Sequence, residues 1–452
     1  MTILQRLNCG DSILIIGLGK TGFCSARFFA NLGLKVRVMD QSSSPKYLSE
    51  IELLFPQIEL CCGTISISWL QQATTIVLSP GISPYKSSWL HPYLTKVVSD
   101  VELFCRCVDA NVIAVTGTNG KTTVTSMLQS ALNNLGYKTA MGANNDNAVL
   151  QLLDYTDIDY YILELSSFQL DLTISMKTKV SALLNISRDH LDWHLDSNNY
   201  TEAKAKIFSN ADIAICHNDV VKKIQINNNK LITFSSNDNK SDFSVKVVGD
   251  ESFIKHKENK LISTSNLTLQ SAINIDNYLA VFAIMDALGI ESDQYIKASN
   301  KFSGLAHRCQ YLGNFSSRFW YNDSKATNSA AVTAALASLA AQHKNIVLLV
   351  GGIFKEEKSP IFSKSLYPGL DTIIAYGENT QLLLEEVDDN INIKVAKDLC
   401  SAIDMAYAES KRQAAIILSP CCASFDHFDN YVHRGEIFTN YVKKHYEHCK
   451  TD

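Results

Sequence analysis

The chain contains little charge, little cysteine and no long apolar run. Charged residues make up 19% of its 452 residues, below the ~25% typical of soluble domains. Its 41 Lys and Arg against 46 Asp and Glu give a net charge of −5, so nothing indicates a nucleic-acid partner. The longest apolar runs, such as Ile346–Val350, are far shorter than the ~20 residues of a membrane span. We therefore expect neither nucleic-acid binding nor membrane insertion.

Twelve cysteines are too few for a disulfide scaffold, and no two have the CxxC spacing of zinc or redox sites. They read as small buried hydrophobes kept reduced in a cytosol. A secretory signal is not expected either, because Asp11 precedes the first apolar run and Gly17-Leu18-Gly19 is no cleavage site. We expect a cytoplasmic protein.

Hydrophobic residues make up 46% of the chain, which is enough for a full core and excludes disorder and collagen-like repeats. At ~150 residues per domain the length indicates about three domains. Short apolar runs alternate with helical patterns, which predicts α/β domains with mostly parallel sheets. The strands are expected at residues 13–16, 36–40, 76–78, 112–115, 160–163, 180–184, 319–321, 346–350, 372–375 and 415–418. Residues 222–267 read as hairpins and loops.

A glycine-rich turn follows the first expected strand. Residues 17–22 fit G-x-G-x-x-G, and Asp40 ends the next strand. Such a turn lets backbone N–H groups approach a diphosphate at a helix N-terminus. A nicotinamide dinucleotide would be the obvious ligand, although close packing of helix on strand would also explain the glycines.

A second loop, Gly117-Thr118-Asn119-Gly120-Lys121-Thr122-Thr123, lies between a buried strand and a helix. That is the context of a phosphate-binding loop. Lys121 would supply charge for the β- and γ-phosphates, and the Thr122 hydroxyl would bind Mg²⁺. Glu164 and His190 follow later strands. Each could hold a metal, although helix capping by Glu164 and structural hydrogen bonding by His190 stay open.

Polar loops at 322–328 and 419–424 also follow expected strands. Together with 117–123, Glu164–Leu170, Asn185–His190 and Gly304–Arg308, these strings resemble the Mur ligases over essentially the whole chain. The strings 322–328 and 418–424 resemble the branch of that family that adds D-glutamate. The resemblance implies a Rossmann-like UDP-substrate-binding domain at 1–108, a central ATP-binding P-loop domain at 109–300 and a Rossmann-like amino-acid-binding domain at 301–452.

The resemblance implies an ATP-dependent ligase that joins D-glutamate to UDP-N-acetylmuramoyl-L-alanine through an acyl phosphate, in peptidoglycan precursor synthesis. ATP and two Mg²⁺ ions would be required, and the chain would be a monomer. The first glycine turn would then face the UDP diphosphate. The alternatives are a sister ligase, a folylpolyglutamate-synthase-like enzyme, an NAD-dependent dehydrogenase and a non-catalytic nucleotide-binding regulator.

The resemblance also implies a role for individual residues in catalysis or in binding a particular ligand. Catalysis would involve Lys121, Glu164, His190 and Lys204. The metal ligands would be Thr122, Glu164, His190 and Lys204, the last as a carbamate, because a bare ammonium would be repelled by Mg²⁺. ATP would be bound by Gly117, Thr118, Asn119, Gly120, Lys121, Thr122, Thr123, Asn274, Asn277, Arg308 and Asp323. The UDP substrate would be bound by Gly17, Leu18, Gly19, Lys20, Thr21, Gly22, Asp40, Ser79, Gly81, Asn144 and His190.

D-Glutamate and the acyl phosphate would meet Lys325, Thr327, Lys355, Ser424 and Phe425. Three positions depart from the family's usual pattern. Ile273 stands where His is usual before the first helix Asn, Ala143 stands where Gly is usual, and Ile353-Phe354 lacks the customary acid near Lys355. These departures concern details of the adenine and D-glutamate contacts, and they leave the reaction class unchanged.

Overall fold

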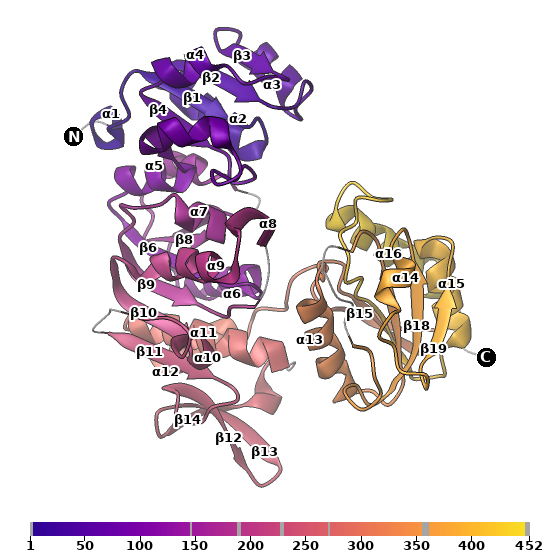
Figure 1. Cartoon of the computed structure of the whole chain (residues 1–452). Coiled ribbons are helices and arrows are strands. Elements are labelled where there is room, and N and C mark those ends of the chain that lie inside the picture. The colour runs from indigo at the N-terminus through magenta and orange to yellow at the C-terminus, as the bar shows by residue number, and fades with distance from the viewer. Residues whose placement is uncertain are drawn as a thin grey trace. The chain divides into compact units, whose positions relative to one another are not determined.

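The computed structural model describes residues 3–144, 147–187, 191–226, 230–269, 272–354 and 361–447. These residues form three sheets, which follow one another along the chain (Figure 1). The chain divides into two compact units, one of residues 1–268 with 276–302 and one of residues 269–275 with 303–452. None of the helices in the described ranges combines the length and apolar character that a membrane crossing needs.

The first sheet is parallel throughout, in the order β3-β2-β1-β4-β5. Its strands are β1 (Ser12–Ile16), β2 (Lys35–Asp40), β3 (Glu59–Cys62), β4 (Thr75–Leu78) and β5 (Val97–Val98). Helices α1 (Ile3–Leu7), α2 (Lys20–Asn31), α3 (Leu48–Leu54), α4 (Ile67–Gln72), η1 (Ser88–Lys96) and α5 (Asp100–Cys107) accompany them. The strand order reverses between β1 and β4, and ligands of open α/β sheets bind at the carboxyl ends of such strands.

The second sheet has the order β14-β13-β12-β11-β10-β9-β6-β8-β7. Its strands are β6 (Asn111–Thr116), β7 (Thr139–Ala143), β8 (Tyr160–Glu164), β9 (Thr178–Leu183), β10 (Ala211–His217), β11 (Leu231–Ser235), β12 (Phe243–Val248), β13 (Glu251–His256) and β14 (Asn259–Ser263). Its helices are α6 (Lys121–Asn134), η2 (Val149–Asp154), α7 (Ser167–Asp171), α8 (Leu191–His194), α9 (Ser197–Ala205), η3 (Lys206–Phe208), α10 (Asn218–Val221), η4 (Thr264–Asn266), α11 (Ala272–Ala287) and α12 (Ser292–Ser299).

The expectation of hairpins and loops at 222–267 is confirmed for the antiparallel strands β12, β13 and β14. It is wrong for β11, which pairs parallel with β10 and with β12. A five-residue strand between Asn- and Lys-rich segments gives little local signal. The partner strand β10 fixes its direction, and that contact is not local in the sequence.

The third sheet has the order β15-β16-β20-β17-β18-β19. Its strands are β15 (Gln310–Phe315), β16 (Arg318–Asn322), β17 (Ile346–Gly351), β18 (Leu370–Tyr376), β19 (Asn392–Val395) and β20 (Ala415–Leu418), with helices α13 (Ser329–Ala340), α14 (Thr380–Leu383), α15 (Leu399–Glu409) and α16 (Tyr431–Tyr446). All neighbouring strands are parallel except the edge pair β15–β16. The predicted α/β class with mostly parallel sheets is confirmed.

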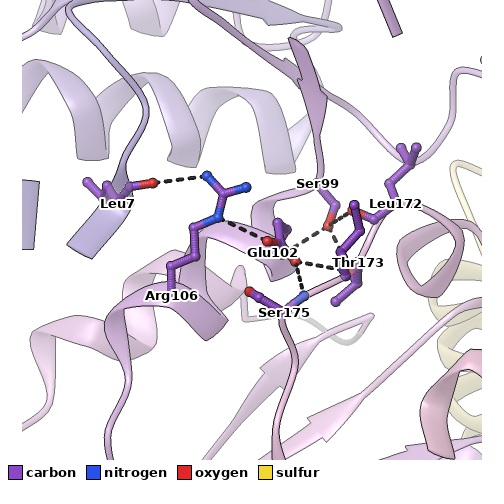
Figure 2. A network of polar contacts seen from close by, with 8 residues as sticks. Leu7, Ser99, Glu102, Arg106, Leu172, Thr173 and Ser175 are labelled. Atoms are coloured by element: carbon purple, nitrogen blue, oxygen red, sulfur yellow. Dashed lines mark hydrogen bonds and ion pairs between the residues drawn. The ribbon is translucent and has the colours of Figure 1, made fainter. Parts of the chain in front are cut away.

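Helix α5 lies between the first and second sheets (Figure 1) and carries a buried carboxylate. Glu102 accepts hydrogen bonds from the backbone N–H groups of Ile174 (2.7 Å) and Ser175 (2.9 Å) and from Arg106 Nε (2.9 Å). Figure 2 shows this network, in which Arg106 Nη1 also donates to the carbonyl oxygen of Leu7. Burial acts to raise the pKa of Glu102, but the bonds from Ser175 and Ile174 hold it below its ordinary value.

Glu102→Gln is expected to lower the free energy of unfolding by about 1–3 kcal/mol at pH 7, because Gln cannot accept all of these bonds. A lowered native pKa contributes stability above the unfolded-state value of ~4.3, and this contribution is lost as the pH falls through the native pKa. The gap between the two proteins should therefore close below pH 4. Chemical denaturation against pH measures this, with Glu202→Gln, at an exposed position of α9, as the control. A gap that persists at low pH would contradict the electrostatic explanation.

Candidate active site

The loop that follows β6 has the backbone of a phosphate cradle. Gly120, the residue before α6, has φ +85°, a left-handed backbone conformation that residues other than glycine rarely adopt. A Cβ there would also approach Asn277 Oδ1 to 2.8 Å. Only glycine fits, and the first N–H groups of α6 have no partner within the helix. The loop therefore presents a helix N-terminus suited to an anion.

Asn185, which follows β9, holds this loop in place. Its Oδ1 accepts from the N–H of Asn119 at 2.9 Å, and its Nδ2 donates to the carbonyl of Asn119 at 3.0 Å. Its own carbonyl accepts from the N–H of Thr118 at 3.1 Å. The backbone donors of Thr118 and Asn119 are thus used inside the protein. The N–H groups of residues 120–123 are the better candidates for phosphate oxygens.

Lys121 and Thr122 open α6 and are both half-buried. The Lys121 ammonium donates to the carbonyl oxygens of Gly117 (2.8 Å) and Thr118 (3.0 Å). The cation therefore lies over the loop that precedes its own helix. This places a positive charge beside the helix N-terminus, where a polyphosphate would need it.

Glu164 ends β8, the strand beside β6, and its side chain is buried. Oε1 accepts from Asn144 Nδ2 at 3.1 Å. Oε2 is fully buried and has no hydrogen-bond partner among the described residues. An unpaired buried carboxylate oxygen is costly, and a cation would relieve that cost. Asn144, predicted to contact the UDP substrate, here orients Glu164.

Lys204 of α9 reaches the same loop. Its side chain is 1% exposed, and Nζ donates to the carbonyl of Gly117 at 3.0 Å and to Thr116 Oγ1 at 3.3 Å. Lys206, two residues on, is part-exposed and pairs with Asp171 at 2.6 Å. The structure therefore separates the two lysines, and only Lys204 lies at the phosphate loop.

The first glycine turn joins β1 to α2. The Leu18 N–H donates to Asp40 Oδ2 at 2.6 Å, and the Ser42 N–H donates to Asp40 Oδ1 at 2.8 Å. Ser79 Oγ donates to the Gly17 carbonyl at 3.0 Å. A Cβ on Gly22 would come within 1.8 Å of that carbonyl. Asp40 and Gly22 thus shape the turn, and the turn meets the loop after β4 where the strand order reverses.

In the second unit Asp323 links the loops after β16 and β20. Its carboxylate accepts from Ser419 Oγ (2.7 Å) and from the N–H of Cys309 (2.9 Å). Burial raises the pKa of Asp323 to about 7 against these bonds. Asp323 was predicted to contact ATP, and the structure shows that both of its oxygens have protein partners.

Three family models match the chain in order. They are described as "Mur ligase MurD-like, N-terminal domain" (residues 11–100), "Mur ligase middle domain" (115–285) and "Mur ligase, glutamate ligase domain" (307–422). The chain is 34% identical over 442 residues to UDP-N-acetylmuramoylalanine--D-glutamate ligase from Buchnera aphidicola, covering 96% of this chain and 98% of that one. The chain belongs to the Mur ligase family.

Other relatives of this Mur ligase carry the same name. The protein from Aliivibrio salmonicida is 34% identical over 96% of this chain and 97% of its own, and that from Coxiella burnetii is 33% identical over 95% and 98%. Among solved structures, a pseudomurein peptide ligase from Methanothermus fervidus matches with a TM-score of 0.60 at 16% identity, over 96% of this chain and all of that one. MurC from Thermotoga maritima matches with a TM-score of 0.59 at 15% identity, over 96% and 99%. These structures confirm the three-domain fold.

As a Mur ligase, the chain uses ATP. Membership of this family argues against the NAD-dependent dehydrogenase, the alternative that the first glycine turn by itself had left open. His190 and Lys355, both predicted site residues, lie outside the described residues. Asn274 and Asn277 both lie on α11. The roles assigned to individual residues stay predictions.

The remaining predicted residues lie on the loops of the second unit. Lys325 Nζ lies 3.8 Å from the centre of the Tyr431 ring. Thr327 is half-buried and Ser424 is buried, whereas Phe425 is 65% exposed. Arg308 lies near enough to Asp323 to act electrostatically on it.

Arg434 was missed by sequence reasoning. This fully buried residue of α16 donates to Ser324, to the carbonyl of Gly351 and to the carbonyl of Cys422. It thereby connects the end of β17 to the loops after β16 and β20. An Arg inside an amphipathic helix reads as a solvated charge, so the sequence carries no signal for this role.

Proposed function

We propose that this Mur ligase joins D-glutamate to UDP-N-acetylmuramoyl-L-alanine and converts ATP to ADP and phosphate in the same reaction. The observation that carries the proposal is the similarity to D-glutamate ligases over almost the whole length, with 34% identity over 96% of the chain. The phosphate loop with Lys121 and Glu164 beside it supports the ATP-dependent half. We propose that the chain acts as a cytoplasmic monomer, with domain bounds at 108 and 300.

The reaction needs a carboxylate to reach the γ-phosphate of ATP. We propose that the N–H groups of residues 120–123 and the Lys121 ammonium hold the phosphates, with Gly117, Thr118 and Asn119 shaping the loop. The substrate carboxylate attacks the γ-phosphorus, and ADP leaves. The amine of D-glutamate then attacks the acyl phosphate, loses a proton, and phosphate leaves. Bringing these anions together requires positive charge and exact placement.

The residues beside the loop fit a magnesium site in part. The unpaired Oε2 of Glu164 suits a hard cation, and we propose Thr122 as a second ligand. A bound Mg²⁺ would screen the phosphate charge. The Lys204 ammonium donates hydrogen bonds to the loop and has no lone pair for a metal ion. Lys204 would therefore be a metal ligand only as a carbamate. Within the described ranges no three His, Cys, Asp or Glu side chains are grouped so that they could hold a metal ion. His190, which we propose as a ligand of a second ion, lies outside these ranges.

For the sugar nucleotide, we propose that the turn at 17–22 binds the UDP diphosphate at the N-terminus of α2. This helix has twelve residues, so its first N–H groups suit an anion. Lys20 is exposed at its first position, and Ser79 and Gly81 flank the same place. Asp40 acts by holding Leu18 and Ser42.

The amino-acid substrate carries two carboxylates at neutral pH. We propose Lys325, Thr327, Lys355 and Ser424 as their donors, because cations and hydroxyls form charge-assisted hydrogen bonds with carboxylates. Phe425 would cover the bound amino acid. We also propose Asn274 and Asn277, which share α11, as contacts of ATP.

The test is ATP-dependent phosphate release with UDP-N-acetylmuramoyl-L-alanine and one amino acid at a time. Release is expected with D-glutamate and not with L-glutamate, L-lysine or meso-diaminopimelate. A response to L-lysine or meso-diaminopimelate alone would overturn the choice of amino acid and favour a sister ligase.

Lys204→Ala is expected to reduce phosphate release by about 10²–10³-fold, and short carboxylates such as formate or acetate should restore part of the rate. The reason is that a small carboxylate can supply the oxygen ligand that the carbamate would provide. Lys206→Ala is the matched control and should retain the wild-type rate, because Lys206 pairs with Asp171 away from the loop. Full activity in Lys204→Ala would refute the assignment.

A further inference from the structure

Trp193, in α8 of the central domain, is bonded to the loop that follows β4 of the first domain. Its indole N–H donates to the carbonyl oxygen of Pro80 at 3.1 Å. Its own carbonyl accepts from Ser83 Oγ at 2.9 Å. Pro80 lies between Ser79 and Gly81, both proposed for the UDP substrate. A residue of the ATP-binding domain therefore holds the substrate loop of its neighbour at two points.

On its other side Trp193 packs into an aromatic cluster of the central domain. Its ring stacks on Phe168 at 4.7 Å and contacts the ring of His194 at 4.5 Å. His194 is fully buried, and its Nε2 shares a hydrogen bond of 2.8 Å with Ser167 Oγ. Ser167 begins α7, three residues after Glu164. The cluster thus reaches the strand end that carries the proposed metal ligand.

The same cluster reaches the phosphate loop. The rings of His194 and Tyr200 form an edge-to-face pair with their centres 5.4 Å apart. The Tyr200 hydroxyl shares a hydrogen bond of 2.9 Å with Thr118 Oγ1. Contacts are therefore continuous from Pro80, through Trp193 and His194, to Thr118. All of them lie within the first compact unit.

An aromatic core could fill this space without polar bonds. Here the indole N–H of Trp193 donates to a carbonyl oxygen of the loop, because a buried Trp N–H usually needs a hydrogen-bond partner. Glu102 also joins the two domains (Figure 2), but it bonds no residue of either proposed ligand loop. The effects of the Trp193 contacts and of the Glu102 contacts between the two domains can therefore be measured separately.

We propose that Trp193 and His194 are positioning residues that set the separation between the loop at 79–81 and the phosphate loop at 117–123. The substrate carboxylate must meet the γ-phosphate, and a shift of about 1 Å between the loops is expected to cost up to 10²-fold in rate. The inference rests on the proposed function, because it takes these loops as the sites of the two nucleotides.

The test uses Trp193→Phe, which keeps an aromatic ring and removes the N–H donor. Losing one buried hydrogen bond is expected to raise the KM for UDP-N-acetylmuramoyl-L-alanine about fivefold to tenfold, with the KM for ATP within twofold of wild type. Because the loops would also be misplaced relative to each other, kcat is expected to fall by up to about 10²-fold. Ser83→Ala, which removes the second bond to the loop, should shift the same constant in the same direction. Trp69→Phe, in the first domain and packed against Arg37, should leave both constants unchanged.

Glu102→Gln supplies the control for stability, since it loosens the joint between the same domains without touching either loop. It should lower the free energy of unfolding and leave the KM for the sugar nucleotide unchanged. If Trp193→Phe and Ser83→Ala behave like Glu102→Gln, the role is merely structural and the inference is overturned.

Fluorescence gives a readout that does not depend on turnover. Binding of UDP-N-acetylmuramoyl-L-alanine beside Pro80 should change the tryptophan emission of the wild type and of Trp69→Phe, and this change should be lost in Trp193→Phe. A wild type that releases no phosphate but shows this pattern would contradict the proposed function alone. An active wild type whose response survives in Trp193→Phe would overturn the inference alone.

Discussion

Lys121→Met is expected to reduce the rate of phosphate release by about 10²–10³-fold. Methionine keeps most of the side-chain length but removes the ammonium that lies over the carbonyls of Gly117 and Thr118. Single-turnover phosphate release measures the effect, and sugar-nucleotide binding should be unaffected.

The matched control is Lys179→Met, an exposed lysine of the same domain that pairs with Asp212. It should retain the wild-type rate. If Lys121→Met stayed within tenfold of wild type while remaining folded, the loop at 117–123 would not be the site of the ATP phosphates.

Glu164→Gln is expected to lower the activity of the enzyme without lowering its stability. Oε2 is a buried carboxylate oxygen with no hydrogen-bond partner among the described residues, so neutralising it removes an unfavourable buried charge. The free energy of unfolding should stay equal or rise, while phosphate release should fall by about 10²–10³-fold. Sites that bind ligands commonly trade stability for function in this way.

Two measurements check this prediction apart from activity. Denaturation compares the two proteins without ligands, and titration calorimetry measures Mg²⁺ binding in the presence of ATP, which should weaken in the variant. Glu202→Gln, an exposed residue of α9, should change neither. A variant that loses stability but binds Mg²⁺ normally would make Glu164 a structural residue.

The buried parallel strands could be predicted because they read as short apolar runs. Ile13–Ile16 and Val112–Val115 became β1 and β6 with one or two added residues. Strand β15 was not predicted, because it is an edge strand whose residues are all at least partly exposed. Half-exposed strands lack the apolar run, and their place depends on the neighbouring strand.

The loop at 117–123 could be singled out from the sequence because its parts are consecutive in the chain. A glycine with positive φ, a lysine and a hydroxyl at the start of a helix form a local pattern. The residues that support the loop could not be predicted in the same way. Asn185 bonds Asn119 across 66 positions, and Lys204 bonds Gly117 across 87.

The amino-acid sequence by itself determined the α/β class and the membership of the Mur ligases, and it singled out the loop at 117–123, because each depends on short, ordered strings of residues. The resemblance had pointed to Lys204, and the tertiary structure showed that its ammonium contacts that loop whereas Lys206 pairs with Asp171. It also showed that Asn144 orients Glu164 and that Trp193 holds the loop after β4. These pairings depend on which strand ends meet, and that is fixed only when distant segments pack into one sheet.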